Sequence, residues 1–124
     1  MDTVLVVDDD PDFRELIRLC IEGEGLRVLL AADCAQGLST LRKERERVAL
    51  VLLDYWMPNM RPCQCAARII ATVHPKTRIV LVTAAVDAAA RAAEVGLSEW
   101  LAKPFELERL QSIVVDVQSA RGAR

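Results

Sequence analysis

The sequence predicts an α/β fold in which one parallel sheet of five strands lies between two layers of helices. The first observation behind this prediction is that short apolar runs, typical of buried strands, alternate with segments whose apolar residues recur at helical spacing. The second is size, because 124 residues, 52% hydrophobic and 27% charged, suit one domain with its own core. We therefore expect a doubly wound domain over residues 1–120 and a short tail at 121–124.

Four apolar runs predict strands, and a weaker run predicts a fifth. The four lie at residues 4–7, 26–30, 50–53 and 79–82, and the weaker run lies at 99–102. The first, third and fourth are apolar throughout, as strands covered on both faces are. The second contains Arg27, and the fifth is preceded by Ser98 and begins with Glu99, so these two are expected at the sheet edges. The order 2-1-3-4-5 with right-handed crossovers satisfies this composition.

The segments between these runs are predicted to be helices. Three of them place apolar residues on one helical face: Phe13, Leu16, Ile17, Cys20 and Ile21; Ala66, Ile69, Ile70 and Val73; and Leu107, Leu110, Val114 and Val117. Asp10 is a good N-cap in front of Pro11, and Pro62 is suited to open the third helix. Gly25 and Gly96 follow helical stretches, where glycine commonly ends a helix.

Charge and hydropathy argue against several classes of function. The chain carries 16 basic and 18 acidic residues, a formal net charge of −2, and has no basic block, so direct nucleic-acid binding is not expected. No apolar run has the length of a membrane span, and the N-terminal segment MDTVLVVDDD is acidic where a signal peptide is basic. We expect a cytoplasmic protein whose partners are proteins or small ligands, without membrane attachment.

The four cysteines are expected to be reduced and to pack as small apolar residues. Zinc sites usually show paired C-x-x-C spacing, whereas Cys63 and Cys65 form C-x-C, and Cys20 and Cys34 are isolated. The single histidine, His74, is at least 9 residues from each of them. A cytoplasmic setting also disfavours disulfides.

Polar residues stand where the predicted strands end. Asp8 and Asp9 follow the first strand, Asp54 ends the third, Thr83 follows the fourth and Lys103 follows the fifth. Doubly wound sheets bind their ligands at the carboxyl ends of the strands, at the switch point. Three close carboxylates repel one another and favour a cation, and oxygen donors suit magnesium or manganese. A carboxylate beside a metal, a hydroxyl and an ammonium group can attack phosphorus, and we assign this role to Asp54.

The motifs VLVVDDDPDF, VLLDYWMP, VLVTAA and WLAKPFEL carry a family resemblance over essentially the whole chain. In order, spacing and strand context they resemble the receiver domain of two-component response regulators, the CheY-like family, with its flavodoxin-like three-layer α/β/α fold. The resemblance implies a signalling domain rather than an enzyme. It also implies that Asp54 accepts a phosphoryl group from the phosphohistidine of a sensor histidine kinase or a phosphotransfer protein, with magnesium as cofactor.

The metal ligands implied by the resemblance come from the first and third strand ends. Asp9 would bind the metal directly, and Asp8 would bind it through water. Asp54 would add its carboxylate, and Trp56 would add its backbone carbonyl, so that its side chain need not affect ligation. Asp10, the next residue of the acidic run, is read instead as the N-cap of the first helix.

The remaining implied roles concern the phosphoryl group and the response to it. Thr83 and Lys103 would contact the phosphoryl oxygens, and the bond between Lys103 and Pro104 resembles one that is cis in the family. Trp100 stands at the switch position, three residues before the lysine, where the family has tyrosine or phenylalanine. The face made by the fourth helix, fifth strand and fifth helix would transmit the change, and its alanine-rich helix could mediate homodimerisation.

Two further residues make this chain differ from the expected pattern. Pro62 occupies a position that is usually glycine, so the loop leading to the third helix should be stiffer. Trp56 lies two residues after the acceptor, where its bulk can obstruct the water that hydrolyses an aspartyl phosphate, unless it points into solvent. Ala85, two residues after Thr83, offers no polar group to orient that water.

Two other functions remain as alternatives. A phosphatase of the haloacid dehalogenase type would need a second aspartate at the position of Trp56 as its general acid. A receiver-like scaffold that is never phosphorylated would not need the full set of Asp9, Asp54, Thr83 and Lys103. The chain is either a stand-alone receiver or part of a longer regulator.

Overall fold

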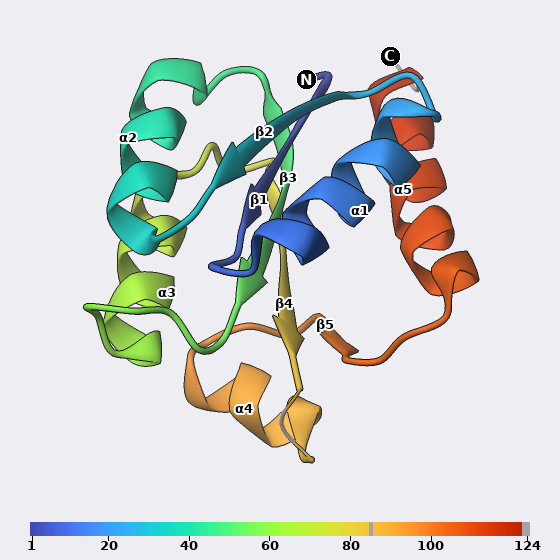
Figure 1. Cartoon of the computed structure of the whole chain (residues 1–124). Helices are drawn as coiled ribbons and strands as arrows, with labels where there is room; N and C mark the ends of the chain where they lie inside the picture. The colour runs from blue at the N-terminus through green and yellow to red at the C-terminus, as the bar shows by residue number, and fades with distance from the viewer. Residues whose placement is uncertain (85, 123–124) are drawn as a thin grey trace.

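Five parallel strands and five helices alternate along the chain, as the sequence predicts. The computed structural model describes residues 1–84 and 86–122, leaving out the side chains of 121 and 122 (Figure 1). The strands are β1 (Thr3–Val7), β2 (Arg27–Ala31), β3 (Val48–Asp54), β4 (Arg78–Thr83) and β5 (Trp100–Ala102). The helices are α1 (Pro11–Glu22), α2 (Cys34–Glu44), α3 (Pro62–Thr72), α4 (Ala88–Glu94) and α5 (Leu107–Gly122). Positions 123 and 124 of the expected tail lie outside the described residues.

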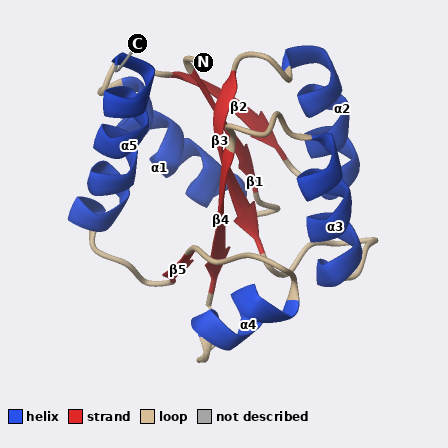
Figure 2. Ribbon diagram, turned by 180° about the vertical axis from the view of Figure 1, so that it is seen from behind, coloured by secondary structure: helices blue, strands red, loops and turns tan. Residues whose placement is uncertain are grey.

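The strand order is β2-β1-β3-β4-β5, which confirms the order derived from strand composition. Every residue of β1 and β3 is buried, whereas β2 and β5 at the edges are partly exposed. Figures 1 and 2 show α2 and α3 on one face of the sheet, α1 and α5 on the other, and α4 near the carboxyl ends of β4 and β5. The fold is therefore a three-layer doubly wound sheet with its switch point between β1 and β3.

Each face of the sheet has its own apolar core. Alternate residues of a strand point to opposite faces, so Leu5 and Val7 pack with the helices α2, α3 and α4, while Val4 and Val6 pack with α1 and α5. Helix α2 approaches β1 closely, because a Cβ at Gly37 would meet a methyl carbon of Val7 at 3.0 Å. This close packing fixes the position of α2 against the sheet.

The predicted helix boundaries are largely confirmed. Asp10 caps α1, and its side chain accepts hydrogen bonds from the backbone of Asp12 and Phe13. Pro62 is the first residue of α3. Gly25 and Gly96 have φ angles of 83° and 81°, which a residue with a side chain rarely adopts.

Three residues predicted on the core faces of helices are instead exposed. Leu16 is 54% exposed, Ile70 is 41% exposed and Leu107 is 43% exposed. Each lies at the margin of its apolar stripe, and a helix resting on a sheet buries only a narrow part of that stripe. Ile17 and Ile21 of the same α1 stripe are buried.

The expectation of four reduced cysteines is wrong for two of them. Cys34 and Cys65 form a disulfide between α2 and α3, while Cys20 and Cys63 are free. The two cysteines are 31 residues apart in sequence, and side-by-side packing of their helices brings the Cα atoms to 5.9 Å. Cysteine spacing alone could not show this proximity. In the described part of the chain, no helix combines the length and apolar character needed to cross a membrane.

Candidate functional site

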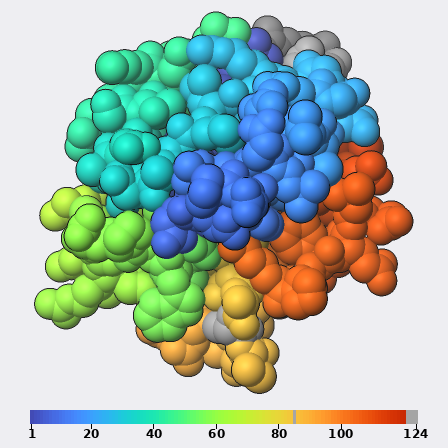
Figure 3. All heavy atoms as spheres, in the orientation of Figure 1, coloured from blue at the N-terminus to red at the C-terminus, as the bar shows by residue number. Residues whose placement is uncertain are grey.

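The carboxyl ends of four parallel strands bring the predicted polar residues to one edge of the sheet. Asp54 is the last residue of β3 and pairs in register with Val82 of β4, next to Thr83. Thr83 in turn pairs with Ala102 of β5, which precedes Lys103. Figure 3 shows the blue, green and orange parts of the chain adjoining on one face of the molecule.

Three carboxylates lie together at the switch point. One oxygen from each of Asp8, Asp9 and Asp54 lies within 4.8 Å of the others. Asp8 is 1% exposed and Asp54 is 8% exposed, whereas Asp9 is open to solvent. Such a group of hard oxygen donors, one of them accessible, fits a divalent cation that keeps several water ligands. The acidic cluster predicted from the sequence therefore exists.

The environment of Asp54 disfavours its charge in the absence of a cation. Burial and the nearby carboxylates of Asp8 and Asp9 together raise the pKa of this carboxyl to about 7, although the Lys103 ammonium opposes the rise. A carboxylate that attacks phosphorus must be ionised. A cation in the acidic cluster would favour the ionised form at neutral pH.

Asp8 is held by contacts on both of its carboxylate oxygens. Its Oδ1 accepts a hydrogen bond of 2.9 Å from the backbone N–H of Asp10, and its Oδ2 lies 2.9 Å from Nζ of Lys103. The side chain of Arg14 donates to the Asp8 carbonyl at 2.7 Å. These contacts orient Asp8 firmly at the end of β1 and leave Asp9 as the accessible carboxylate.

Lys103 crosses the site from the end of β5. Its Nζ lies 3.8 Å from Oδ1 of Asp54 and 4.0 Å from the ring centroid of Phe13. The ring of Phe105 packs edge-to-face on Phe13 at 6.1 Å between centroids. The bond between Lys103 and Pro104 is cis, as the resemblance implies. The spacing of apolar residues predicts Phe13 on the core face of the first helix, but no sequence signal indicates its contact with Lys103.

Thr83 and Trp100 lie on one face of the sheet. Because Leu81 pairs with Trp100 and Thr83 pairs with Ala102, the two residues occupy alternate positions on neighbouring strands. Thr83 is fully buried, and its carbonyl accepts a 2.7 Å hydrogen bond from the backbone of Lys103. Trp100 is 38% exposed. The arrangement is compatible with the predicted switch pair.

The loop between β3 and α3 contains Trp56, and it also makes a contact with α4 that the sequence does not predict. Trp56 is 61% exposed, and its ring packs edge-to-face on Tyr55 at 4.7 Å between centroids. Tyr55 is buried, and its hydroxyl donates a 3.0 Å hydrogen bond to Oε1 of Glu94 at the end of α4. The loop is thus connected to α4. Ala85, which entered the prediction on water orientation, lies outside the described residues.

The site as a whole has the parts of a phosphoryl acceptor. It contains a buried carboxylate, a lysine ammonium 3.8 Å away, a neighbouring threonine and two further carboxylates. The ammonium and hydroxyl groups could neutralise or bind phosphoryl oxygens.

The family model and the similar proteins of known sequence point to the same family. The family model for the response regulator receiver domain matches residues 4–115. The transcriptional regulatory protein ZraR of Klebsiella oxytoca is 36% identical over 111 residues, which are 87% of this chain and 24% of that protein. An uncharacterised 14.6 kDa protein of Leptolyngbya boryana is 36% identical over 106 residues, covering 83% of this chain and 79% of that protein. The chain thus spans about a quarter of the length of ZraR.

Solved structures show the same fold. The response regulator TrrA of Thermotoga maritima, in complex with magnesium and beryllium fluoride, has a TM-score of 0.80 at 26% identity, covering 94% of this chain and 99% of that one. The chemotaxis protein CheY4 of Vibrio cholerae has a TM-score of 0.78 at 28% identity, covering 94% of this chain and 98% of that one.

Proposed function

This chain belongs to the response regulator receiver domain family, and we propose that it signals by accepting a phosphoryl group on Asp54. The observation that carries the proposal is the position of Asp54. Its carboxylate ends a central strand, clusters with those of Asp8 and Asp9 within 4.8 Å, and lies 3.8 Å from the Lys103 ammonium. Receiver domains are signalling domains of two-component systems, so the donor is expected to be a phosphohistidine of a sensor kinase or a phosphotransfer protein.

The transfer needs few groups from this chain. A carboxylate oxygen of Asp54 attacks phosphorus in line, the phosphorus–nitrogen bond breaks, and its electron pair returns to the histidine nitrogen of the donor, which takes up a proton. Lys103 moves from Asp8 toward a phosphoryl oxygen, a short shift because it already lies between the two aspartates. Thr83 donates a hydrogen bond to another phosphoryl oxygen.

The acidic cluster would hold the divalent cation that this transfer uses. Asp9 would bind it directly, Asp8 through water, and Asp54 and the backbone carbonyl of Trp56 would complete the protein ligands. When bound, magnesium or manganese neutralises charge on the transferred oxygens. The three oxygen donors fit such an ion, and the similar TrrA structure from Thermotoga maritima is a complex with magnesium.

Phosphorylation of Asp54 would change the conformation of the surface made by α4, β5 and α5, which partner proteins would recognise. Thr83 moves toward the phosphoryl group, and Trp100 turns into the space beside β4. This surface would also support homodimerisation, since the exposed side chains along α4 include the small Ala89, Ala90 and Ala93. Sedimentation with and without beryllofluoride tests this part, because an activated dimer sediments faster and an unchanged profile favours a monomeric partner-binding form.

Intact-mass measurement tests the central proposal. After incubation with magnesium and acetyl phosphate, the wild-type chain should gain one phosphoryl group, and the Asp54→Asn variant should gain none. An equal gain in both proteins would refute Asp54 as acceptor. A complete lack of adduct in the folded wild type would favour the unphosphorylated scaffold, and turnover of added phosphomonoesters would favour the phosphatase.

A further inference from the structure

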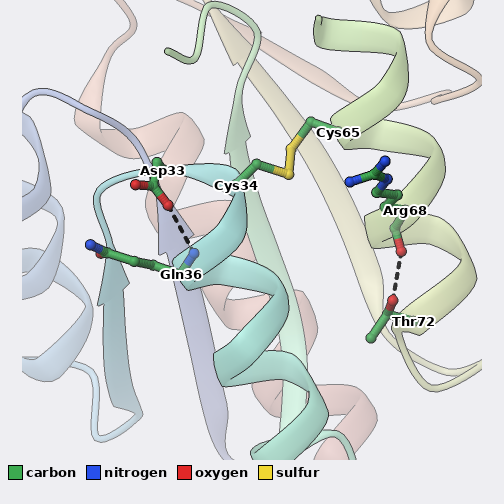
Figure 4. Close-up of a disulfide and its surroundings, with 6 residues drawn as sticks. All are labelled: Asp33, Cys34, Gln36, Cys65, Arg68 and Thr72. Atoms are coloured by element: carbon green, nitrogen blue, oxygen red, sulfur yellow. Dashed lines mark hydrogen bonds between the residues drawn. A yellow bond between two sulfur atoms is a disulfide. The ribbon is translucent and has the colours of Figure 1, made fainter. Parts of the chain in front are cut away.

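The disulfide between Cys34 and Cys65 joins α2 to α3 at the ends that face the candidate site. Cys34 is the first residue of α2, and Cys65 lies in the first turn of α3 (Figure 4). The two side chains are 2% and 1% exposed, so the bond is enclosed by the core beside the sheet. It therefore fixes the distance between the starts of two helices.

The α2 end of this bond is anchored independently. Asp33 caps α2, and its Oδ1 accepts a 2.8 Å hydrogen bond from the backbone of Gln36 (Figure 4). The Gln36 side chain in turn accepts from the backbone of Ala32 at 2.9 Å, which completes a reciprocal cap. The close approach of Gly37 to Val7 also holds this turn against β1. Cys34 thus belongs to a fixed part of the fold.

The α3 end of the bond has fewer supports. Helices α1, α2 and α4 are each capped by an aspartate side chain, whereas among the described residues no side chain caps the start of α3, where Arg61 is the N-cap residue. The far end of α3 is held by hydrogen bonds. The Thr72 hydroxyl donates to the carbonyl of Arg68 at 2.6 Å (Figure 4), and the Arg45 side chain donates to the carbonyl of Thr72 at 3.1 Å. The disulfide therefore adds a covalent anchor to the first turn of α3, which otherwise is held by the core packing of Cys65 and Ala66.

This first turn adjoins the loop that follows Asp54. Tyr55 and Met57 of that loop are buried in the same apolar cluster as both cysteines. Loosening the start of α3 would consequently loosen the packing of the segment that carries the Trp56 carbonyl.

We propose that Cys34 and Cys65 form a reversible oxidation site whose disulfide anchors the start of α3 and thereby sets metal affinity at the acidic cluster. The link to the metal rests on the proposed function, whereas the oxidation site itself does not. The uncapped first turn of α3 gives access, since local opening there exposes the Cys65 sulfur to exchange. Exposed Cys63, two residues earlier, lies on another side of the helix and takes no part in the bond.

The oxidant would be a small disulfide, such as the oxidised form of a low-molecular-weight thiol. One cysteine thiolate attacks it, which forms a mixed disulfide and releases one small thiol; the second cysteine then attacks the mixed disulfide and releases the other. The two cysteines together lose two electrons and two protons, which appear in the two released thiols. A dithiol reductant reverses the reaction and becomes a disulfide itself.

Thiol counting on the full chain tests the oxidation site. After treatment with oxidised glutathione and unfolding in denaturant, the chain should show no thiol at Cys34 or Cys65, with Cys20 and Cys63 either free or carrying one glutathione each, and after treatment of the folded chain with dithiothreitol it should show all 4 free thiols. Peptide mapping should place the bond between Cys34 and Cys65, and Cys63→Ser should leave it unchanged. Four thiols after oxidation, or a bond that dithiothreitol cannot reduce in the folded chain, would overturn the proposal.

Hydrogen exchange and magnesium titration test whether the disulfide anchors the start of α3 and affects metal affinity. Reduction should speed amide exchange at residues 57–66 relative to the first turn of α2, and should weaken magnesium binding severalfold. Cys65→Ala should reproduce the reduced state, and because it could unfold the chain, the reduced wild type is the primary comparison. Equal exchange and equal magnesium affinity in both redox states would overturn the anchoring role. Failure of Asp54 to accept phosphate in both states would instead count against the proposed function alone, because exchange and thiol counting do not depend on it.

Discussion

The ammonium group of Lys103 lies 4.0 Å from the centre of the Phe13 ring, although 90 residues separate the two in sequence. The ring comes from the first turn of α1, and the lysine comes from the end of β5. The face of an aromatic ring carries partial negative charge, which attracts a cation placed over it. Together with the 2.9 Å contact to Asp8, this attraction keeps the ammonium group at the edge of the site, within a short movement of Asp54.

Replacing Phe13 with leucine should slow phosphorylation of Asp54 by about two- to fivefold, because a cation–π contact of this kind is worth about 0.5–1 kcal/mol. Phe13→Tyr keeps the aromatic face and should restore the rate. The measurement is the rate of adduct formation from acetyl phosphate at saturating magnesium. Equal rates in the leucine and tyrosine variants would assign Phe13 a packing role only.

Charge and capping residues made most of the fold and the location of the site predictable. Arg27 and Glu99 identified the edge strands, and Asp10 identified the start of α1, because each reports on its local exposure or local hydrogen bonding. The strand-end positions of Asp8 and Asp54 followed from parallel topology alone.

Contacts between distant side chains could not be predicted in the same way. The disulfide of Cys34 and Cys65 depends on how closely two helices pack, a distance with no signature in cysteine spacing. The bond from Tyr55 to Glu94 depends likewise on where α4 rests. Leu16 shows the same limit for burial, since its exposure is decided by how far α1 turns toward the sheet.

Without metal, Asp54→Asn should stabilise the protein at pH 8. The pKa of Asp54 is raised from 3.8 to about 7, so the folded chain holds this proton more tightly than the unfolded chain. Stability therefore falls as pH rises from about 4 to about 7, and the neutral asparagine avoids a cost of about 1–3 kcal/mol. Urea unfolding in EDTA at pH 4.5 and pH 8 measures the difference. A variant that is less stable than wild type at pH 8 would contradict the raised pKa.

Magnesium binding should depend on Asp9 and be visible in the fluorescence of Trp56. Asp9 is the exposed member of the carboxylate cluster, and its replacement by asparagine removes one anionic ligand, so affinity should fall about tenfold or more. The titration signal should survive in Trp100→Tyr and be lost in Trp56→Phe. Undiminished binding by Asp9→Asn would mean that Asp9 is not a ligand.

Reduction of the disulfide should lower the melting temperature. Cys34 and Cys65 close a loop with a sequence separation of 31 residues, and a cross-link over such a loop raises the free energy of the unfolded chain by about 3–4 kcal/mol. Thermal unfolding of the oxidised and reduced chains gives the comparison, with Cys63→Ser as a variant that should behave as wild type in both states. Identical melting curves would show that the cross-link does not stabilise the fold.

The lifetime of the aspartyl phosphate should depend on the bulk of Trp56. Trp56 lies two residues after Asp54, and although its side chain is 61% exposed, its edge-to-face contact with Tyr55 limits the freedom of the ring to turn. Tyr55 is itself fixed by its hydrogen bond to Glu94. Hydrolysis needs a water in line behind phosphorus, and we expect the indole to cover part of that approach.

Replacing Trp56 with asparagine should therefore shorten the half-life of the phosphorylated form severalfold, a barrier loss of about 1 kcal/mol, because the smaller amide opens the approach and can orient the water. Trp56→Phe retains most of the bulk and should stay close to wild type. The measurement is decay of the adduct by intact mass after removal of acetyl phosphate, with magnesium present throughout. If the asparagine variant decays no faster than wild type, the indole points away from the attacking water and the lifetime is set by Thr83 and Lys103.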